Sequence, residues 1–343
     1  MIFMKKVLVT GGTGYLGSWI VKYLLDRGYE VQLPVRDQVE NNRHRYLKNI
    51  AENSSGSLNF WYGVDLLKEG SYDLAMEGCE ILFHVASPFF IQSKNPQKEL
   101  IDPAVKGTRN VLGAVNKTSS VKRVVLTSSV AAIYGDNVDM QELGIDMLNE
   151  SHYNKSSSLT HQPYSYSKLL AEKLAWEIYN KQNKWNLVVI NPGFIMGPVL
   201  SKTSISESIN FISDILKGKF YLGAPSLTLS YVDVRDVALA HIIASEKKFS
   251  EGRHIITNKS FTILQITDII KQLYGKRFKL PSSESPGWLT YLFGPLFGVT
   301  RKFIKRNLGY PLYLDNTKSK KDLGVKYTEF KKTIDDMIRS VLE

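Results

Sequence analysis

Residues 6–25 read KVLVTGGTGYLGSWIVKYLL, and this stretch decides the fold of the chain. Residues 7–9 are all apolar, as in a strand that is covered on both faces of a parallel sheet. An amphipathic helical run follows at residues 18–25, and Gly11, Gly14 and Gly17 lie between the strand and this run. A strand, a glycine-rich turn and a helix in this order are typical of the first unit of a dinucleotide-binding sheet.

The three glycines have separate tasks in such a turn. Gly11 allows the tight turn, Gly14 lets backbone amides approach a pyrophosphate, and Gly17 lets the helix pack closely on the strand. The positive end of the helix also attracts the anion. A turn without a ligand is the alternative, because glycines serve ordinary turns too. We predict cofactor contacts from the turn residues Gly11, Thr13, Gly14, Tyr15, Leu16 and Gly17.

The first half of the chain continues to alternate strand and helix patterns, which predicts βαβ units and a parallel sheet. We expect an α/β fold, a Rossmann-type doubly wound parallel sheet with helices on both faces. Residues 1–192 would form the dinucleotide-binding domain. Residues 193–343 would form a smaller substrate-binding lobe, with part of this chain returning to the sheet. The predicted strands are residues 6–10, 30–35, 58–63, 81–86, 121–128 and 187–191, and the predicted helices are residues 15–27, 41–51, 71–76, 99–118 and 164–181.

Composition places the 343 residues among globular proteins, with 43% hydrophobic and 22% charged residues. Cys79 is the single cysteine, so no disulfide forms within the chain, and the scattered histidines predict no metal site. A reducing, cytoplasmic location without a targeting segment is expected. The net charge of +11 suggests nucleic acid or an anionic membrane surface, yet a solvated basic surface beside an anionic ligand explains it as well. No nucleic-acid motif is present, so we expect no nucleic-acid partner.

The second predicted strand ends at Val35-Arg36-Asp37, where the adenosine ribose of a dinucleotide is expected. The guanidinium of Arg36 suits a 2′-phosphate and favours NADP over NAD, with Arg43 adding positive charge. Asp37 could instead bind a ribose hydroxyl, as in NAD-dependent proteins. After the third strand, Asp65 and Leu66 are placed to contact the adenine, although a helix cap is an alternative task for Asp65.

Tyr164 and Lys168 form a Y-x-x-x-K motif, which puts both side chains on one face of a helix. A nearby ammonium stabilises a phenolate and lowers the tyrosine pKa, so that the phenol becomes an acid or base near neutral pH. The same spacing recurs at Tyr327 and Lys331, far from the turn. A strand that ends in small hydroxyl residues, among them Ser129, would direct a hydroxyl into the ligand crevice.

Taken together, these features resemble the extended short-chain dehydrogenase/reductase family, in its dihydroflavonol reductase, cinnamoyl-CoA reductase and carbonyl reductase branch. The resemblance covers essentially the whole chain and is strongest over residues 6–198. The segments that carry it are residues 7–19, 35–37, 83–88, 127–129, 191–198, 233–238 and 320–324, together with Tyr164 and Lys168.

The resemblance implies a site. Ser129 would polarise the carbonyl, Tyr164 would donate the proton, and Lys168 would hold the nicotinamide ribose. The further cofactor contacts that it implies are Val85, Ala86, Ser87, Pro192, Gly193 and Ile195. The expected activity is NADPH-dependent reduction of an aldehyde or ketone, reversible as alcohol oxidation. The alternatives are an NAD-dependent 3β-hydroxysteroid-type dehydrogenase and a non-catalytic dinucleotide-binding or sensing protein.

Aromatic residues suggest where a small-molecule substrate binds. Phe89, Phe194 and Tyr231 are candidates for the pocket. Residues 288–303 are rich in apolar and aromatic residues and lead into Lys305 and Arg306, so this segment could be a lid, plain packing or a peripheral membrane contact. A homodimer is a further expectation from the resemblance.

Overall fold

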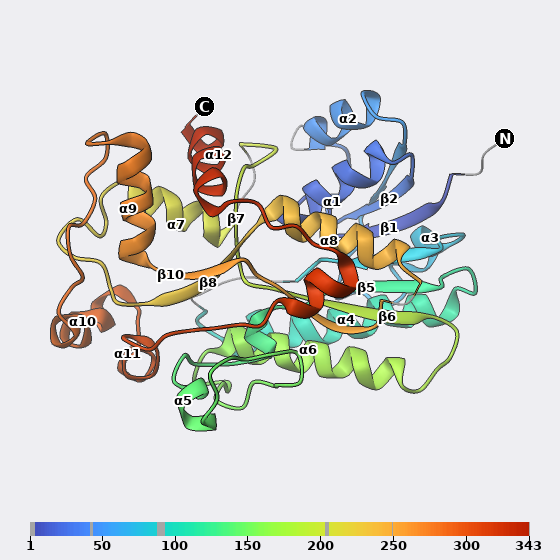
Figure 1. Cartoon of the computed structure of the whole chain (residues 1–343). Helices are drawn as coiled ribbons and strands as arrows, with labels where there is room; N and C mark the ends of the chain where they lie inside the picture. Colours follow the sequence, from blue (N-terminus) through green and yellow to red (C-terminus); the bar gives the residue numbers. More distant parts are fainter. Residues whose placement is uncertain (1–3, 42–43, 88–92, 203–205, 249, 343) are drawn as a thin grey trace.

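The computed structural model of the chain describes residues 4–41, 44–87, 93–202, 206–248 and 250–342. A parallel sheet of seven strands lies at its centre, in the order β3-β2-β1-β4-β5-β6-β9. Helices cover both faces of this sheet (Figure 1), so the expected doubly wound Rossmann-type α/β fold is confirmed. The strands are β1 (Lys6–Thr10), β2 (Glu30–Val35), β3 (Ser57–Tyr62), β4 (Ile81–His84), β5 (Arg123–Thr127), β6 (Asn186–Pro192) and β9 (Gly252–Ile256).

The apolar run of β1 supplies core residues to both faces of the sheet. Val7 and Val9 pack into one hydrophobic cluster, and Leu8 between them packs into another. All three side chains are fully buried. Successive side chains of a strand point to opposite faces, so a strand covered on both sides is apolar throughout.

Two helical layers enclose the sheet. One face carries α1 (Tyr15–Asp26), α2 (Arg45–Glu52) and α8 (Val234–Glu246). The other carries α3 (Asp73–Met76), α4 (Asp102–Lys117) and α6 (Pro163–Tyr179) (Figure 1). Shorter elements on the connections are η2 (Gln97–Ile101), η3 (Val130–Ala132), α5 (Asp139–Leu143) and η5 (Ser319–Leu323).

A smaller sheet, in the order β10-β8-β7, lies beside the main one with its own hydrophobic core. Although α8 and β9 come after residue 192, they belong to the layers of the large sheet, with β9 paired to β6. The division of the chain into two domains at residue 192 therefore stays a prediction. The elements of the smaller lobe are β7 (Phe194–Met196), α7 (Glu207–Leu216), β8 (Thr228–Asp233), β10 (Lys259–Thr262), α9 (Ile263–Tyr274), α10 (Gly287–Phe293), η4 (Gly294–Phe297), α11 (Arg301–Asn307) and α12 (Phe330–Leu342).

Candidate active site

The glycine turn after β1 leaves no room for a side chain at Gly11 and at Gly17. Gly11 has a φ of +67°, and a Cβ placed there would lie 2.8 Å from the Cα of Ala86. A Cβ at Gly17 would lie 2.1 Å from the carbonyl oxygen of Gly11, so this glycine lets α1 pack against the turn. Gly14 is the N-cap residue of α1 and donates its N–H to the same oxygen at 3.0 Å. The turn and the start of α1 therefore form a cradle that fits a pyrophosphate.

Thr10, the last residue of β1, joins this turn to the neighbouring strand β4. Its Oγ1 accepts the N–H of Val85 at 3.1 Å and the N–H of Ala86 at 3.0 Å. The Nδ1 atom of His84 lies 2.9 Å from the same oxygen. Val85 and Ala86, two of the expected cofactor contacts, are thus held beside the glycine turn, and Ser87 follows them. Sequence reasoning missed Thr10, although a hydroxyl residue directly before the first glycine was an available signal.

Three of the turn residues are engaged within the fold. Tyr15 donates its hydroxyl to the carbonyl of Gly197 at 2.6 Å, and Leu16 packs in the core under α1. The carbonyl of Thr13 accepts the hydroxyl of Tyr46 at 3.2 Å. Contacts of Tyr15 and Leu16 with a cofactor would therefore come from their backbone N–H groups.

Two charged residues, Arg36 and Asp37, follow β2 and differ in their surroundings. Arg36 is exposed, whereas Asp37 lies 3.2 Å from the Nε2 atom of His44, measured at its Oδ2. The His44 ring is itself buried and stacks on Phe60 at 5.4 Å between ring centres. His44 was missed by the sequence analysis, and Arg43 lies outside the described residues. Asp37 is thus already engaged, while the guanidinium of Arg36 faces solvent at the expected ribose position.

Asp65 and Leu66 follow β3, as expected. Asp65 Oδ1 accepts the N–H of Leu67 at 2.8 Å. This contact is of the capping kind that the sequence offered as an alternative to adenine binding. Leu66 packs against Gly107, where a Cβ would lie 2.5 Å from the Leu66 Cγ. The Leu66 carbonyl also accepts the side-chain amide of Asn110 at 3.0 Å. Their contact with adenine stays a prediction.

Ser129, Tyr164 and Lys168 come together at the carboxyl end of β5. Ser129 caps η3, where its Oγ accepts the N–H of Ala131 at 3.1 Å. The Ser129 side chain also hydrogen-bonds with the phenol of Tyr164, the second residue of α6. Lys168 lies one turn further along α6 and is buried, with its Nζ 6.0 Å from the centre of the Tyr164 ring.

Burial is the largest cause of the pKa shifts of Tyr164 and Lys168. It raises the pKa of Tyr164 above its usual value, and the hydrogen bond with Ser129 opposes this rise. The lowered tyrosine pKa that we expected from a neighbouring ammonium is therefore wrong for this structure, because desolvation of the phenolate outweighs the favourable contacts. Burial also lowers the pKa of Lys168 to about 8, while the Glu172 carboxylate raises it.

Lys168 links the trio to the glycine turn. Burial, followed by the charge of Lys168, lowers the pKa of His84 to about 3, which keeps this imidazole neutral. His84 in turn contacts Thr10, directly before Gly11. The candidate catalytic groups and the candidate cofactor cradle therefore share one edge of the sheet, at the carboxyl ends of its strands.

The end of β6 lies at the same edge. Pro192 closes the strand, and Gly193 donates its N–H to the carbonyl of Ile256 at 3.0 Å. A Cβ at Gly193 would lie 2.6 Å from the Ser230 carbonyl oxygen, so only glycine fits at this crossing. Ile195 packs partly buried against the core of the large sheet. Contacts of these residues with a cofactor stay predictions.

Tyr231 does not line the mouth of a pocket, and this expectation is wrong. The residue is fully buried, and its ring packs against Phe194, Phe261 and Phe330 with centres 5.7, 6.4 and 5.4 Å apart. Tyr231 thus belongs to the core of the smaller lobe, because its strand β8 lies in the middle of the three-stranded sheet. Phe194 is partly buried at the same core, and Phe89 lies outside the described residues.

A second polar network holds the start of α6 and was not predicted. Its centre is the fully buried Asp136, and its partners come from distant parts of the chain. Gln162, which directly precedes α6, has a φ of +53°. Such a conformation is unusual for a residue with a side chain, and the hydrogen bonds of this network hold Gln162 in it. Asp136 accepts from Arg306 Nε at 2.6 Å, His161 Nε2 at 2.8 Å, and Gln162 Nε2 and Asn307 Nδ2 at 2.7 Å each.

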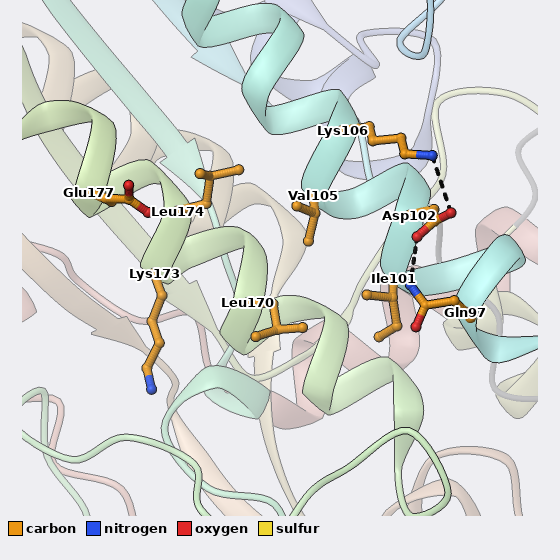
Figure 2. Close-up of a pocket in the computed structure, with 9 residues that line it drawn as sticks. All are labelled: Gln97, Ile101, Asp102, Val105, Lys106, Leu170, Lys173, Leu174 and Glu177. Carbon is orange, nitrogen blue, oxygen red and sulfur yellow. Dashed lines mark hydrogen bonds and ion pairs between the residues drawn. The ribbon is translucent and has the colours of Figure 1, made fainter.

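An open cavity of about 380 Å³ lies elsewhere, between α4 and α6. Figure 2 shows Val105 and Leu170 facing each other across it, with polar residues at its rim. Neither the glycine turn nor the trio of Ser129, Tyr164 and Lys168 contributes to its lining, so it is separate from the candidate active site.

Comparison with known proteins defines the class. The chain is an NAD(P)-dependent oxidoreductase. It belongs to the NAD dependent epimerase/dehydratase family, whose model matches residues 7–257. It is 34% identical to cinnamoyl-CoA reductase CAD2 of Medicago truncatula over 98% of this chain and 95% of that protein.

Solved structures agree with this assignment. Gre2 of Candida albicans, determined in complex with NADPH, is 29% identical and superposes with a TM-score of 0.80 over 98% of each chain. The yeast methylglyoxal/isovaleraldehyde reductase Gre2, also complexed with NADPH, is 27% identical, with a TM-score of 0.78 over 98% of each chain. The expected family is therefore confirmed.

Proposed function

We propose that the chain reduces an aldehyde or ketone to an alcohol with NADPH, and catalyses the reverse oxidation. The observation that carries this proposal is the hydrogen bond between Ser129 and Tyr164, with Lys168 buried one turn along the same helix. The cofactor supplies the hydride to the carbonyl carbon. The likeness to a methylglyoxal/isovaleraldehyde reductase supports a carbonyl substrate.

The three residues have different roles in the proposed reaction. Tyr164 donates the proton to the carbonyl oxygen, and its raised pKa keeps the phenol protonated at neutral pH. Ser129 holds the developing negative charge on that oxygen through its hydroxyl. Lys168 binds the nicotinamide ribose and places a positive charge beside the phenol as the proton leaves.

The cofactor is NADP(H), and two features support this. The cradle at Gly11 and Gly17 admits backbone only, as an approaching pyrophosphate requires. Arg36 is exposed at the end of β2, where a guanidinium suits a 2′-phosphate, whereas Asp37 is engaged by His44. The two Gre2 structures contain NADPH.

The experiment is a panel of aldehydes, diketones, flavonoids and steroids with NADPH, followed through the absorbance of the cofactor. Fluorescence titration with NADPH and NADH accompanies it. We expect turnover of at least one aldehyde or ketone and tighter binding of NADPH. Tight NADH binding with turnover of a steroid would instead identify the NAD-dependent 3β-hydroxysteroid-type dehydrogenase. Tight dinucleotide binding with no turnover would identify a non-catalytic sensor.

Other partners are secondary proposals. A homodimer is one of them, and sedimentation analysis tests it. In the segment 288–303, α10 has no buried residue, and Trp288 and Leu296 are 69% and 79% exposed. Arg301 and Lys302 beside them are also exposed. Among the described residues, no helix is both long and apolar enough to cross a bilayer. Co-sedimentation with anionic vesicles tests a peripheral contact.

A further inference from the structure

Glu172 is a buried carboxylate on the face of α6 that carries Tyr164 and Lys168. The three residues follow one another at intervals of four, so they lie along one side of the helix. The Glu172 side chain has no exposed surface, and a buried carboxylate is costly unless it is paired and hydrogen-bonded. Its contacts show how this cost is offset.

One oxygen of Glu172 holds the strand ends next to the trio. Oε2 accepts the hydroxyl of Ser128 at 2.5 Å and the side-chain amide of Asn191 at 2.8 Å. The same amide of Asn191 donates to the backbone carbonyl of Ser129 at 3.1 Å. The carboxylate thus ties β5 and β6 to α6 directly behind the Ser129 hydroxyl that contacts Tyr164.

The other oxygen is paired with a buried cation. Glu172 Oε1 lies 2.6 Å from Arg253 Nε, and the Arg253 side chain is 6% exposed. Arg253 belongs to β9 and also donates to the carbonyls of Glu150 and His152. Its guanidinium lies over the ring of Tyr153 at 4.1 Å. Arg253 is therefore a close, buried partner of Glu172 and is itself fixed by several contacts.

We propose that Glu172, held by Arg253, is a positioning residue of the active site: it fixes Ser129 through Ser128 and Asn191, and it stabilises the ammonium form of Lys168. This inference rests on the proposed carbonyl reduction. Glu172 acts through other residues, because its own oxygens are occupied by Ser128, Asn191 and Arg253.

The charged groups around Lys168 make this role measurable. Among the described residues, those that interact with Lys168 are Tyr164 and Glu172 on α6 and His84 from β4. His84 is neutral at physiological pH, so Glu172 supplies the neighbouring negative charge. The ammonium of Lys168 deprotonates at about pH 8, and removal of the Glu172 charge lowers this value further.

The test is the pH profile of Glu172→Gln, a substitution that removes the charge and keeps the shape. We expect the alkaline limb of the NADPH-dependent reduction to move down by about one pH unit, a tenfold loss in proton affinity. We also expect kcat to fall about tenfold or more, because Ser129 is less firmly placed. The matched control is Glu177→Gln, at an exposed position of the same helix, which should change neither quantity.

Ser128→Ala separates the two proposed roles of Glu172, the placement of Ser129 and the stabilisation of the Lys168 ammonium. It removes a hydrogen bond to Glu172 and keeps the charge, so kcat should fall while the alkaline limb stays in place. If Glu172→Gln fails to fold, the double variant Glu172→Gln/Arg253→Met removes both members of the buried pair and leaves no unpaired charge. This variant should fold and show the same displaced limb. An unmoved limb in either Glu172 variant overturns the proposal.

A readout that needs no turnover distinguishes this inference from the proposed function. The free energy of unfolding of the protein alone is measured from neutral to alkaline pH. The destabilisation by Glu172→Gln should be larger at neutral pH, where Lys168 is charged, than above about pH 8. A pH-independent difference overturns the coupling of Glu172 to Lys168. Absence of turnover in the parent protein, with this pH dependence present, overturns only the proposed reduction.

Discussion

The side chain of Ser129 hydrogen-bonds with the phenol of Tyr164, although the two residues belong to different elements of the fold. Ser129 follows β5 and caps a short helical turn, whereas Tyr164 begins α6. The carbonyl oxygen of a substrate that contacts one of these hydroxyls is within reach of the other. A proton donor and a stabiliser of negative charge thus act on the same atom.

Replacement of Tyr164 by Phe should lower kcat for carbonyl reduction by about 10²- to 10⁴-fold, because it removes the proton donor. The affinity for NADPH should be nearly unchanged, since the ring is kept. Steady-state kinetics and fluorescence titration measure the two quantities. Tyr327→Phe is the control, because Tyr327 has the same spacing to a lysine but contacts Ser319, at 2.7 Å. A Tyr164→Phe variant as active as the parent would remove Tyr164 from the mechanism.

Arg36→Ala should weaken NADPH binding by about 10- to 100-fold, the value of a charge-assisted contact with the 2′-phosphate. Binding of NADH should change little, because NADH lacks that phosphate. Titration of both cofactors checks this difference. Arg27→Ala removes another exposed arginine, next to the far end of α1, and should leave both affinities as they are. An equal loss for the two cofactors would contradict the assignment of Arg36.

Gly17→Ala should destabilise the protein by about 1–3 kcal/mol or more and weaken dinucleotide binding, because the new Cβ overlaps backbone. That atom would lie 2.1 Å from the Gly11 carbonyl oxygen. The matched control is Gly113→Ala in α4, where a Cβ meets no atom within 4 Å. Alanine in an open helical position should stabilise the protein by up to about 1 kcal/mol. Urea unfolding compares the two variants, and equal effects would refute the packing argument.

Asp236 should make the stability pH-dependent in weakly acidic solution. Burial raises its pKa from 3.8 to about 6, although both oxygens accept hydrogen bonds from Thr328. The folded state therefore binds more protons than the unfolded state between these two values. The contribution of Asp236 to the free energy of unfolding falls as the pH rises through this window, by up to about 3 kcal/mol.

Asp236→Asn removes this titration and keeps the shape. Its free energy of unfolding, measured by urea titration at several pH values, should depend less on pH across the same range. A parallel pH dependence in the parent and the variant would show that Asp236 is not the group responsible.

Arg306→Gln should destabilise the protein by about 1–3 kcal/mol, since it removes a charged hydrogen-bond partner from the buried Asp136. The lost contacts are the 2.6 Å bond from Arg306 Nε to Asp136 and the bonds from the same guanidinium to Asp139 and Glu142. We also expect a lower kcat, because Asp136 holds Gln162 directly before α6. Arg301→Gln, at an exposed position of the same helix, should change stability by less than about 0.5 kcal/mol. Equal unfolding midpoints for the two variants would contradict this.

Much of the fold follows from local sequence. The bounds of β1 and β2 agree with the predicted residues 6–10 and 30–35, because each strand is a short segment rich in apolar residues and bounded by turn residues. Boundaries were less accurate where the chain leaves a strand: β4 ends at His84, where we expected residue 86, since Val85 and Ala86 turn to contact Thr10.

The sequence by itself determined the glycine turn and the pairing of Tyr164 with Lys168. Both depend on short-range geometry: a backbone conformation that excludes a Cβ, and the repeat of a helix. Three features were decided by the tertiary structure alone. Glu172 pairs with Arg253, and Asp136 accepts hydrogen bonds from His161 and Arg306. Tyr231 lies in the hydrophobic core. These residues become neighbours through the order of the strands and the return of the later chain to the sheet, which no local pattern encodes. Desolvation, a property of the packed molecule, likewise set the pKa of Tyr164 against the local expectation.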